Sequence, residues 1–194
     1  TTPFASSAAS DVYKRQLITT AAVLFYILEI KAIGKPIDDL NGCNIYYNGW
    51  RFGKSHGKHH SEDGYYYGKK WQCVEFIKRY YYEQLNHEMP NVWGHAKHFF
   101  DTTLVHGAMN EERNLIQFEN GGDIKPAVND IIIFRNTKYG HVGIVSEVSD
   151  GYIIVAQQNV RKNTREKFAL SKQDDVWYVG CLLYTSPSPR DEKV

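Results

Sequence analysis

The sequence predicts an α+β fold, in which one main helix is followed by an antiparallel sheet. Residues 73–86 show the apolar spacing of a helix. Three short β-like runs come later, at residues 130–135, 141–148 and 152–158. Because the strands follow the helical segment and do not alternate with it, the pattern favours an α+β domain over a βαβ arrangement.

The composition is that of one globular domain. The chain has 194 residues, of which 42% are hydrophobic and 23% charged, and this length is sufficient for a domain with its own core. Lys and Arg together number 23 and Asp and Glu 22, so the chain lacks the basic excess of a nucleic-acid-binding protein. The odd count of three Cys residues does not fit a closed set of disulfides.

Both ends of the sequence differ from its middle. Residues 1–16 contain S-S-A-A-S-D-V-Y-K-R-Q, and residues 181–194 contain C-L-L-Y-T-S-P-S-P-R-D. Both strings resemble translated sequencing-adaptor read-through, and flexible termini rich in Ser, Pro and charge are the alternative. Since both strings occur together, we interpret the two ends as non-native flanks and leave them out of the fold reasoning.

An apolar run occupies residues 17–30, L-I-T-T-A-A-V-L-F-Y-I-L-E-I, and Glu29 interrupts it. A membrane-spanning helix needs about 20 apolar residues. We interpret the run as the remnant of a membrane anchor or of a signal-peptide core, with a buried core helix as the alternative. On this interpretation the protein is membrane-anchored or exported, and it acts in the cell envelope.

Short β-like pieces and a polar loop precede the main helix. Residues 38–70 include N-I-Y-Y-N-G-W-R-F and then the His- and Gly-rich stretch H-G-K-H-H-S-E-D-G. In the helix, Val74, Ile77 and Tyr81 recur at spacings of about one turn. Asn86 is expected to end this helix.

A second helix is expected over residues 94–105, and the rest of the domain is expected to form the sheet. The strands at residues 141–148 and 152–158 are joined through Asp150-Gly151, which is a strong hairpin signal. Residues 165–170 are expected to add a further strand. The predicted sheet is therefore built mainly from neighbouring hairpins.

Side chains in these elements suggest a nucleophilic site. Cys73 stands at the start of the helix, where unpaired N–H groups and the helix dipole favour the thiolate. Backbone N–H groups there, together with the side chain of Gln72, are candidate donors to an oxyanion. His141 opens a strand, and Gln157 and Asn159 lie two residues apart on the next one, so both amides are expected to face the imidazole. Although a lone Cys is more often a core residue, the combination favours a catalytic site.

Four motifs occur in a characteristic order: W-Q-C-V-E-F, P-A-V-N-D-I-I-I-F, G-H-V-G-I-V and A-Q-Q-N. In this order and spacing they resemble the CHAP family, the cysteine, histidine-dependent amidohydrolases and peptidases. Gly94 and Ala96 also match a G-x-A segment near the groove of that family. The resemblance implies a papain-like domain over residues 38–180, whose nucleophile begins a helix packed on an antiparallel sheet. It implies Cys73 as nucleophile and His141 as base.

The third position of the site departs from the family pattern. Members commonly carry Glu in an E-Q-N motif, and this chain has Gln157 there, 16 residues past His141. A neutral amide can orient the imidazole but cannot offset the charge of an imidazolium. Papain-like sites also work with Asn in this role, so Gln157 and Asn159 are both candidates, and we favour Gln157.

The resemblance implies a bacterial thiol-dependent hydrolase that cleaves amide or peptide bonds, usually in peptidoglycan. One alternative is a small-amide amidase similar to the amidase half of glutathionylspermidine synthetase/amidase. Another is a CHAP domain that binds wall peptides without cleaving them, and the presence of both Cys73 and His141 argues against it. The apolar run favours the wall substrate over a cytosolic amide. No cofactor is expected.

No metal site is expected either. His56, His59 and His60 cluster in one loop, and Glu62 and Asp63 precede the nucleophile, where some relatives bind calcium. Zinc requires four well-spaced ligands, and two acids without the D-x-D-x-D-G pattern do not make a typical calcium loop. We interpret the loop as a solvated polar segment.

Overall fold

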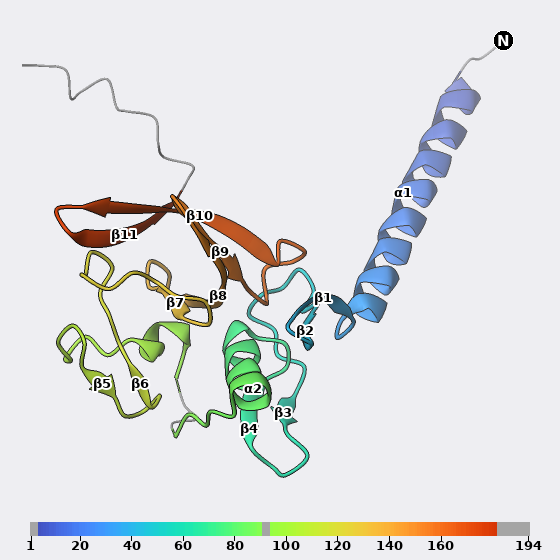
Figure 1. The fold of residues 1–194 in the computed structure, drawn as a ribbon. Helices are drawn as coiled ribbons and strands as arrows, with labels where there is room; N and C mark the ends of the chain where they lie inside the picture. The colour runs from blue at the N-terminus through green and yellow to red at the C-terminus, as the bar shows by residue number, and fades with distance from the viewer. Residues whose placement is uncertain (1–3, 91–93, 182–194) are drawn as a thin grey trace, which may run out of the picture.

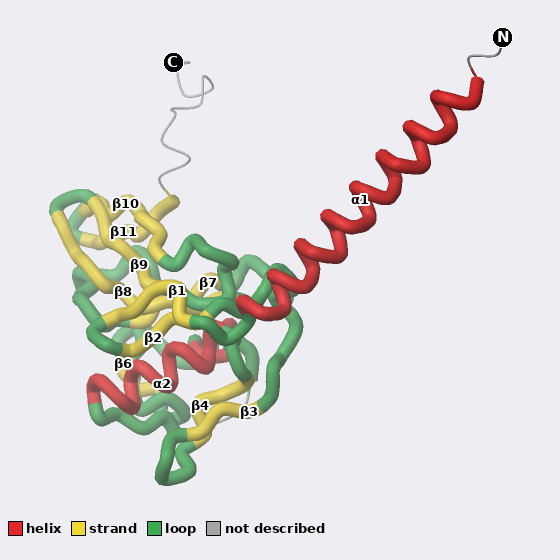
Figure 2. The backbone as a smooth tube through the Cα atoms, turned by 90° about the vertical axis from the view of Figure 1, so that its right-hand side faces the viewer, coloured by secondary structure: helices red, strands yellow, loops and turns green. Residues whose placement is uncertain are grey.

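A small domain of helix and sheet carries a long N-terminal helix that projects away from it (Figures 1 and 2). The structure, a computed structural model, describes residues 4–90 and 94–181. The projecting helix is α1 (Phe4–Ala32), and the helix of the domain is α2 (Cys73–Leu85). The predicted α+β class is confirmed, and so is the helix that begins at Cys73.

The centre of the fold is an antiparallel sheet of five strands in the order β11-β10-β9-β8-β7. Its strands are β7 (Ile131–Phe134), β8 (His141–Ser149), β9 (Tyr152–Ala156), β10 (Arg165–Gln173) and β11 (Val176–Cys181). Neighbours in the sheet are also neighbours in the chain, as expected for a series of hairpins. The predicted Asp150-Gly151 turn joins β8 to β9, and Gly151 has a φ of 85°, a conformation that glycine adopts without strain. β11 was not predicted from the sequence.

Three two-stranded ladders surround this sheet. They are β1 (Pro36–Leu40) with β2 (Cys43–Tyr46), β3 (Lys58–His60) with β4 (Tyr66–Lys69), and β5 (Met109–Asn110) with β6 (Leu115–Ile116). Figure 2 shows α2 lying alongside β3 and β4, beneath the β1–β2 ladder.

The prediction of a second helix over residues 94–105 is wrong. Only a short 3₁₀ helix, η1 (Ala96–Phe99), forms there. Phe100 is already extended, and the Asp101 carboxylate accepts hydrogen bonds from the backbone N–H and the hydroxyl of Thr103, at 2.9 and 2.7 Å. Such a local side-chain turn competes with helix formation, so the helix stops after one turn.

Apolar side chains cover both faces of the five-stranded sheet. Successive side chains of a strand point to opposite faces, which allows one strand to serve two cores. On the side of α2, Phe76, Ile77 and Tyr80 pack with Val142, Ile144 and Ala156. On the other side the buried residues are Val145, Ile153, Val155, Phe168 and Leu170. The sheet is thus fixed between two apolar layers.

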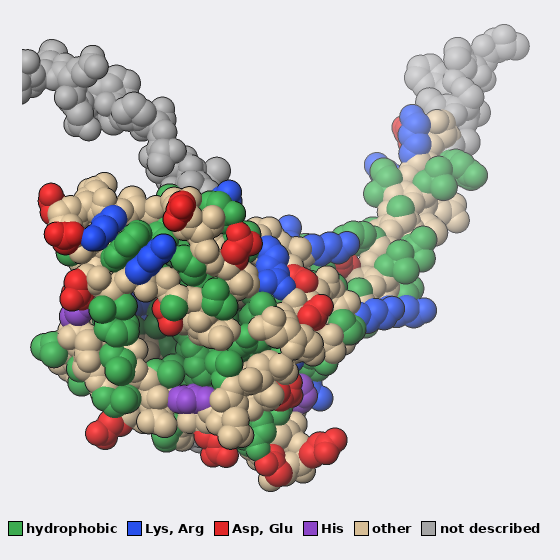
Figure 3. All heavy atoms as spheres, in the orientation of Figure 1, with side chains coloured by type: hydrophobic (Ala, Val, Ile, Leu, Met, Phe, Trp, Pro, Cys, Tyr) green, Lys and Arg blue, Asp and Glu red, His purple; other side chains and the backbone are tan. Residues whose placement is uncertain are grey.

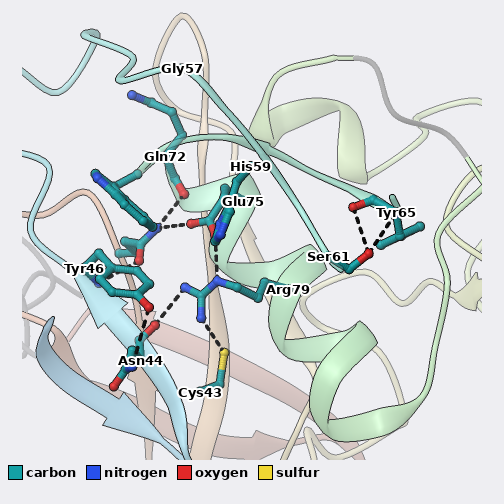
Figure 4. Close-up of polar contacts among 12 residues, drawn as sticks. Cys43, Asn44, Tyr46, Gly57, His59, Ser61, Tyr65, Gln72, Glu75 and Arg79 are labelled. Carbon is teal, nitrogen blue, oxygen red and sulfur yellow. Dashed lines mark hydrogen bonds and ion pairs between the residues drawn. The ribbon is translucent and has the colours of Figure 1, made fainter. Parts of the chain in front are cut away.

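A buried ionic network fastens α2 to its surroundings (Figure 4). Glu75 and Arg79 are 0% and 3% exposed and are joined by a bond of 2.6 Å between Glu75 Oε1 and Arg79 Nε. Arg79 also donates to Asn44 O on β2, at 2.7 Å. His59 Nδ1 on β3 lies 2.8 Å from Glu75 Oε1, and Gln158 Nε2 donates to Glu75 Oε2 at 2.6 Å. For His59 the interpretation of a solvated loop is therefore wrong, because its imidazole is a partner in this network.

Burial alone would raise the pKa of Glu75. The bonds from His59, Arg79 and Gln158 and the positive charge of Arg79 outweigh burial and lower that pKa below its ordinary value. The carboxylate therefore stays ionised, as a buried charge does when it is paired and fully hydrogen-bonded.

α1 includes the whole apolar run at residues 17–30 and continues without a break from residues of the preceding flank. No helix in the described part of the chain is long and apolar enough to cross a membrane. The expected transmembrane segment is therefore not supported, because Glu29 ends the apolar run before the about 20 residues that a bilayer requires. Residues 182–194, which make up most of the C-terminal flank, lie outside the described residues.

Deleting residues 1–30 should leave the domain folded, because the large apolar side chains of α1 from Val12 to Ile30 are exposed. One hydrogen bond, 2.7 Å from the Tyr47 hydroxyl to Glu29 Oε2, would be lost. Such a bond contributes about 1 kcal/mol, or roughly 2–4 °C in melting temperature. A deletion of residues 1–28, which keeps Glu29, is the control in thermal melts. An unfolded product of either deletion would show that α1 belongs to the core.

Candidate active site

Cys73 is the first residue of α2, and Gln72 is its N-cap, with an extended backbone at φ −79° and ψ 159°. The Cys73 side chain is 8% exposed. Burial raises the pKa of the thiol, and hydrogen bonding by the backbone N–H groups of Val142, Val74 and Cys73 itself lowers it by less. From the sequence, the start of the helix is expected to favour the thiolate. In the structure burial prevails, and the pKa of the thiol lies above its ordinary value.

His141 opens β8, directly before the residue whose N–H approaches the Cys73 sulfur. Its ring stacks beside Phe134 of β7, with 6.1 Å between ring centroids. Nε2 of His141 lies 2.9 Å from Oε1 of Gln157. Burial lowers the pKa of His141, and the bond with Gln157 and the charge of Glu166 raise it by less. The imidazole is therefore a neutral base at neutral pH.

The amide of Gln157 fixes which nitrogen of His141 carries the hydrogen. Gln157 is 2% exposed, and its Nε2 donates to Asn163 O at 3.1 Å and to Glu166 Oε2 at 2.9 Å. A carbonyl and a carboxylate can only accept, so the amide oxygen must point to the imidazole. His141 Nε2 then carries the hydrogen, and Nδ1 keeps a lone pair for a proton from the thiol.

Two glycines make room for this arrangement. A Cβ at Gly143, two residues after His141, would lie 2.4 Å from Cγ1 of Val155 and 2.9 Å from the carbonyl oxygen of Ala156. A Cβ at Gly140, which has a φ of 72°, would lie 2.6 Å from the backbone nitrogen of Lys97. The first glycine lets the strands bearing His141 and Gln157 approach closely. The second lets η1, which follows Gly94, pack against the turn before His141.

Asn159 is not placed beside the imidazole, which corrects the expectation that both amides face it. β9 ends at Ala156, and Asn159 has a left-handed backbone with a φ of 69°. Its Nδ2 donates to Gln72 Oε1 and to Phe52 O, both at 3.0 Å, and its Oδ1 accepts from Asn48 Nδ2 at 2.6 Å. Asn159 therefore ties the end of the strand to the loop before α2.

Gln72 is not placed as an oxyanion donor. Its Nε2 donates to Phe52 O at 3.1 Å and to Lys54 O at 2.7 Å, so both amide hydrogens are directed at main-chain carbonyls. Of the oxyanion donors that the sequence suggested, the backbone N–H of Cys73 remains. As an N-terminal helical residue, Cys73 has no intrahelical acceptor for this group.

The backbone of β8 approaches the Cys73 thiol, but the imidazole of His141 is not hydrogen-bonded to it. No hydrogen bond links the Cys73 sulfur to the imidazole among the described residues. Catalytic hydrogen bonds are often long without substrate and tighten when it binds. Cys73, His141 and Gln157 thus form a candidate triad, and their catalytic roles stay predictions.

A cavity of about 990 Å³ opens beside the five-stranded sheet. Figure 3 shows hydrophobic side chains gathered around a hollow on the face that carries β5, β6, β10 and β11. His141, Gln157 and Glu166 line the cavity together with aromatic residues such as Phe134 and Trp177. Cys73 is not a lining residue, so the cavity reaches the base and its partners but does not by itself define the substrate path.

Two acidic residues of this region, Glu75 and Glu166, were not predicted from the sequence. Glu75 lies two residues after Cys73, and its spacing of four from the oppositely charged Arg79 on the helix was a usable signal of an ion pair. Glu166 lies on β10 and bonds to Gln157. Its signal was a charge that alternates with Phe168 and Leu170 on one strand face.

Acidic and imidazole groups before Cys73 have partners inside the protein. The Asp63 carboxylate accepts hydrogen bonds from the hydroxyls of Ser61 and Tyr82, and His56 Nε2 lies 3.3 Å from Asn48 O. Within the residues that the structure describes, no group of three or more His, Cys, Asp or Glu is placed to hold a metal ion.

Comparison with known proteins identifies relatives of this domain. The family model of the CHAP domain matches residues 62–159. Trypanothione synthetase of Crithidia fasciculata is 35% identical over 133 residues, which are 63% of this chain and 20% of that protein. The bifunctional glutathionylspermidine synthetase/amidase of Escherichia coli (strain K12) is 30% identical over 105 residues, 50% of this chain and 16% of that protein. The chain thus spans a fifth or less of the length of these curated relatives.

Iodoacetamide should modify Cys73 before Cys43. Cys43 is 1% exposed, burial raises its pKa to about 12, and Arg79 Nη1 donates to its sulfur at 2.9 Å. Because burial also raises the pKa of Cys73, its labelling should accelerate as the pH rises past about 8.5, the value of a free thiol. Peptide mapping by mass spectrometry over a pH series would show the order, with Cys43→Ser as control. A first adduct on Cys43 would contradict the assignment of the nucleophile.

Proposed function

Because the chain belongs to the CHAP domain family, we propose that it hydrolyses amide bonds with Cys73 as nucleophile and His141 as base. The observation that carries this proposal is the 2.9 Å contact between His141 Nε2 and Gln157 Oε1. That contact leaves Nδ1 of a neutral imidazole available as proton acceptor, on the strand whose backbone approaches the thiol. This is the arrangement that a thiol needs for activation by a general base.

In the proposed reaction the thiol proton moves to His141 Nδ1 while the Cys73 sulfur attacks the carbonyl carbon of the amide. The backbone N–H of Cys73 stabilises the charge that develops on the carbonyl oxygen. The imidazolium then gives its proton to the amine nitrogen as the C–N bond breaks, leaving a thioester on Cys73. Water, deprotonated by the neutral imidazole, attacks the thioester and releases the acid and the thiol.

Proton transfer in this scheme accompanies the attack and does not precede it. Burial raises the pKa of the thiol and lowers that of the imidazole, and both shifts favour the neutral pair over an ion pair. A bound carbonyl therefore meets a thiol that becomes nucleophilic only as its proton leaves. General alkylating reagents are therefore expected to react slowly with Cys73, whereas a well-positioned amide is hydrolysed.

For the substrate we propose a small amide of the glutathione–polyamine type. Support comes from the name of one relative, a glutathionylspermidine synthetase/amidase, which aligns with half of this chain. The second candidate is an amide bond of peptidoglycan in the cell envelope, which the resemblance to wall-hydrolysing members of the family favours. Both substrates use the same chemistry at Cys73 and His141.

The purified protein should release spermidine from glutathionylspermidine. Liquid chromatography with mass spectrometry would detect the released spermidine. Digestion of purified peptidoglycan, with identification of new termini, tests the second candidate in parallel. Cys73→Ala and His141→Ala should each lower kcat by roughly 10³-fold or more, and Cys43→Ser should not. Hydrolysis of peptidoglycan alone would select the second substrate. Activity that survives in Cys73→Ala would disprove the proposed chemistry.

Variants of Gln157 and Asn159 should show which amide orients His141 and which one supports the loop before α2. Gln157→Ala removes the contact that fixes the imidazole and should lower kcat by about 10²-fold. Asn159→Ala removes bonds to Asn48, Gln72 and Phe52 and should lower the melting temperature by several degrees. Steady-state kinetics and thermal melts on both variants make the comparison. If Asn159→Ala abolishes turnover in a folded protein while Gln157→Ala barely alters it, Asn159 is the orienting residue.

A further inference from the structure

Glu166 is a carboxylate on an otherwise apolar strand face. Along β10, Glu166, Phe168 and Leu170 alternate onto one side, and the latter two are buried in the core layer opposite α2. Glu166 itself is half-buried and lines the cavity beside His141. A charged side chain is disfavoured at such a position unless it has a partner.

The hydrogen-bond partner of this carboxylate is the amide of Gln157, at 2.9 Å. No Lys or Arg in the described ranges forms an ion pair with Glu166. Its neighbours on β10 are engaged elsewhere: Arg165 binds Asp38 at 2.8 Å, and the Lys167 ammonium lies 3.5 Å from the ring centroid of Tyr152. The negative charge of Glu166 is therefore directed at the residue that orients His141.

We propose that Glu166 is a positioning residue of the site, which acts through Gln157 to hold the tautomer of His141 and to supply the negative charge that Gln157 lacks. The inference rests on the proposed function, in which His141 becomes an imidazolium during the reaction. Family members commonly carry a carboxylate next to the histidine. In this chain the carboxylate is one side chain further away, on Glu166.

The direction of the amide supports this role. If Glu166 did not accept from Gln157 Nε2, only the carbonyl of Asn163 would hold that end of the amide. A flipped amide would present N–H groups to His141, and Nε2 would then have to be the unprotonated nitrogen. Nδ1 would carry the hydrogen and could no longer receive the thiol proton. Glu166 therefore favours the amide orientation that general-base catalysis needs.

The charge of Glu166 acts when the proton moves. After His141 Nδ1 accepts the proton of Cys73, positive charge is shared with Nε2–H, whose bond to Gln157 Oε1 strengthens. The polarised amide then donates more strongly to Glu166, as hydrogen bonds in a chain reinforce one another. No proton leaves Nε2 in this step, and Glu166 stays ionised throughout.

Other titratable groups lie on or next to the elements that pack against β8, the strand of His141. They are Cys73 on α2, Arg135 after β7, and His95, Lys97 and His98 at η1. The Arg135 guanidinium lies over the ring of Phe100, at 5.6 Å. Among charged groups it is Glu166 that shifts the pKa of His141, and it raises that pKa against the larger lowering by burial.

Glu166→Gln tests the charge while keeping an oxygen that can accept from Gln157. We expect kcat to fall roughly 10-fold, a typical effect of losing a partner behind a working side chain, with KM and melting temperature unchanged. The pKa of His141, followed by NMR of the imidazole, should fall, because the negative charge that favours the imidazolium is gone. Glu147→Gln removes an exposed carboxylate from the same strand as His141 and is the matched control.

The double variant Gln157→Glu/Glu166→Gln moves the carboxylate next to His141 and the amide to β10. It should recover most of the activity lost in Glu166→Gln and raise the pKa of His141. Gln157→Glu alone would place two carboxylates in hydrogen-bonding contact, where they share a proton, so its pH–rate profile should show an additional ionisation.

An unchanged His141 pKa in Glu166→Gln would overturn the inference. So would a loss of activity that comes with a lower melting temperature and is not rescued in the double variant, since this would indicate a structural role. The NMR titration does not depend on turnover. If the wild-type protein hydrolyses no amide, the proposed function fails, and the titration still decides whether Glu166 acts on His141.

Discussion

The buried carboxylate of Glu75 is the constraint on which the rest of the site depends. An ionised group in the core of a domain must be fully paired, and Glu75 meets this need with three partners, Arg79, His59 and Gln158. Arg79 and its bond to Asn44 link α2 to β2, His59 links it to β3, and Gln158 links it to the end of β9. Since Cys73 lies only two residues before Glu75, this network sets where the thiol stands against the sheet.

The same network connects the two halves of the site. Gln158 bonds to Glu75 on one side of the strand, while its neighbour Gln157 bonds to His141 on the other. Adjacent residues of an extended segment point to opposite faces, so two consecutive amides serve both the scaffold and the base. Asn159 then turns into the loop that holds Gln72. The A-Q-Q-N segment thus ties together α2, His141 and the loop before Cys73.

Burial of the thiol and the imidazole gives the site a neutral resting state. In the proposed reaction, charge appears only when the proton moves to His141, and the neutral amide of Gln157 cannot balance it alone. A carboxylate one side chain further away keeps the charge outside the contact with the imidazole. This separation limits how far the resting imidazole is pulled towards its protonated form, because electrostatic attraction weakens with distance.

Elements whose signals are local could be predicted from the sequence alone. The apolar period of α2 and the Asp150-Gly151 turn follow from side chains close together in the chain, and the order of the four motifs identified the family. Only the tertiary structure decided the electrostatics, because burial is a property of the assembled core. Burial raised the pKa of Cys73. Contacts between distant segments turned Asn159 and Gln72 towards Phe52 and placed Glu166 beside Gln157. The expected helix over residues 94–105 failed for a related reason, since turn-forming contacts of Asp101 outweighed a weak helical pattern.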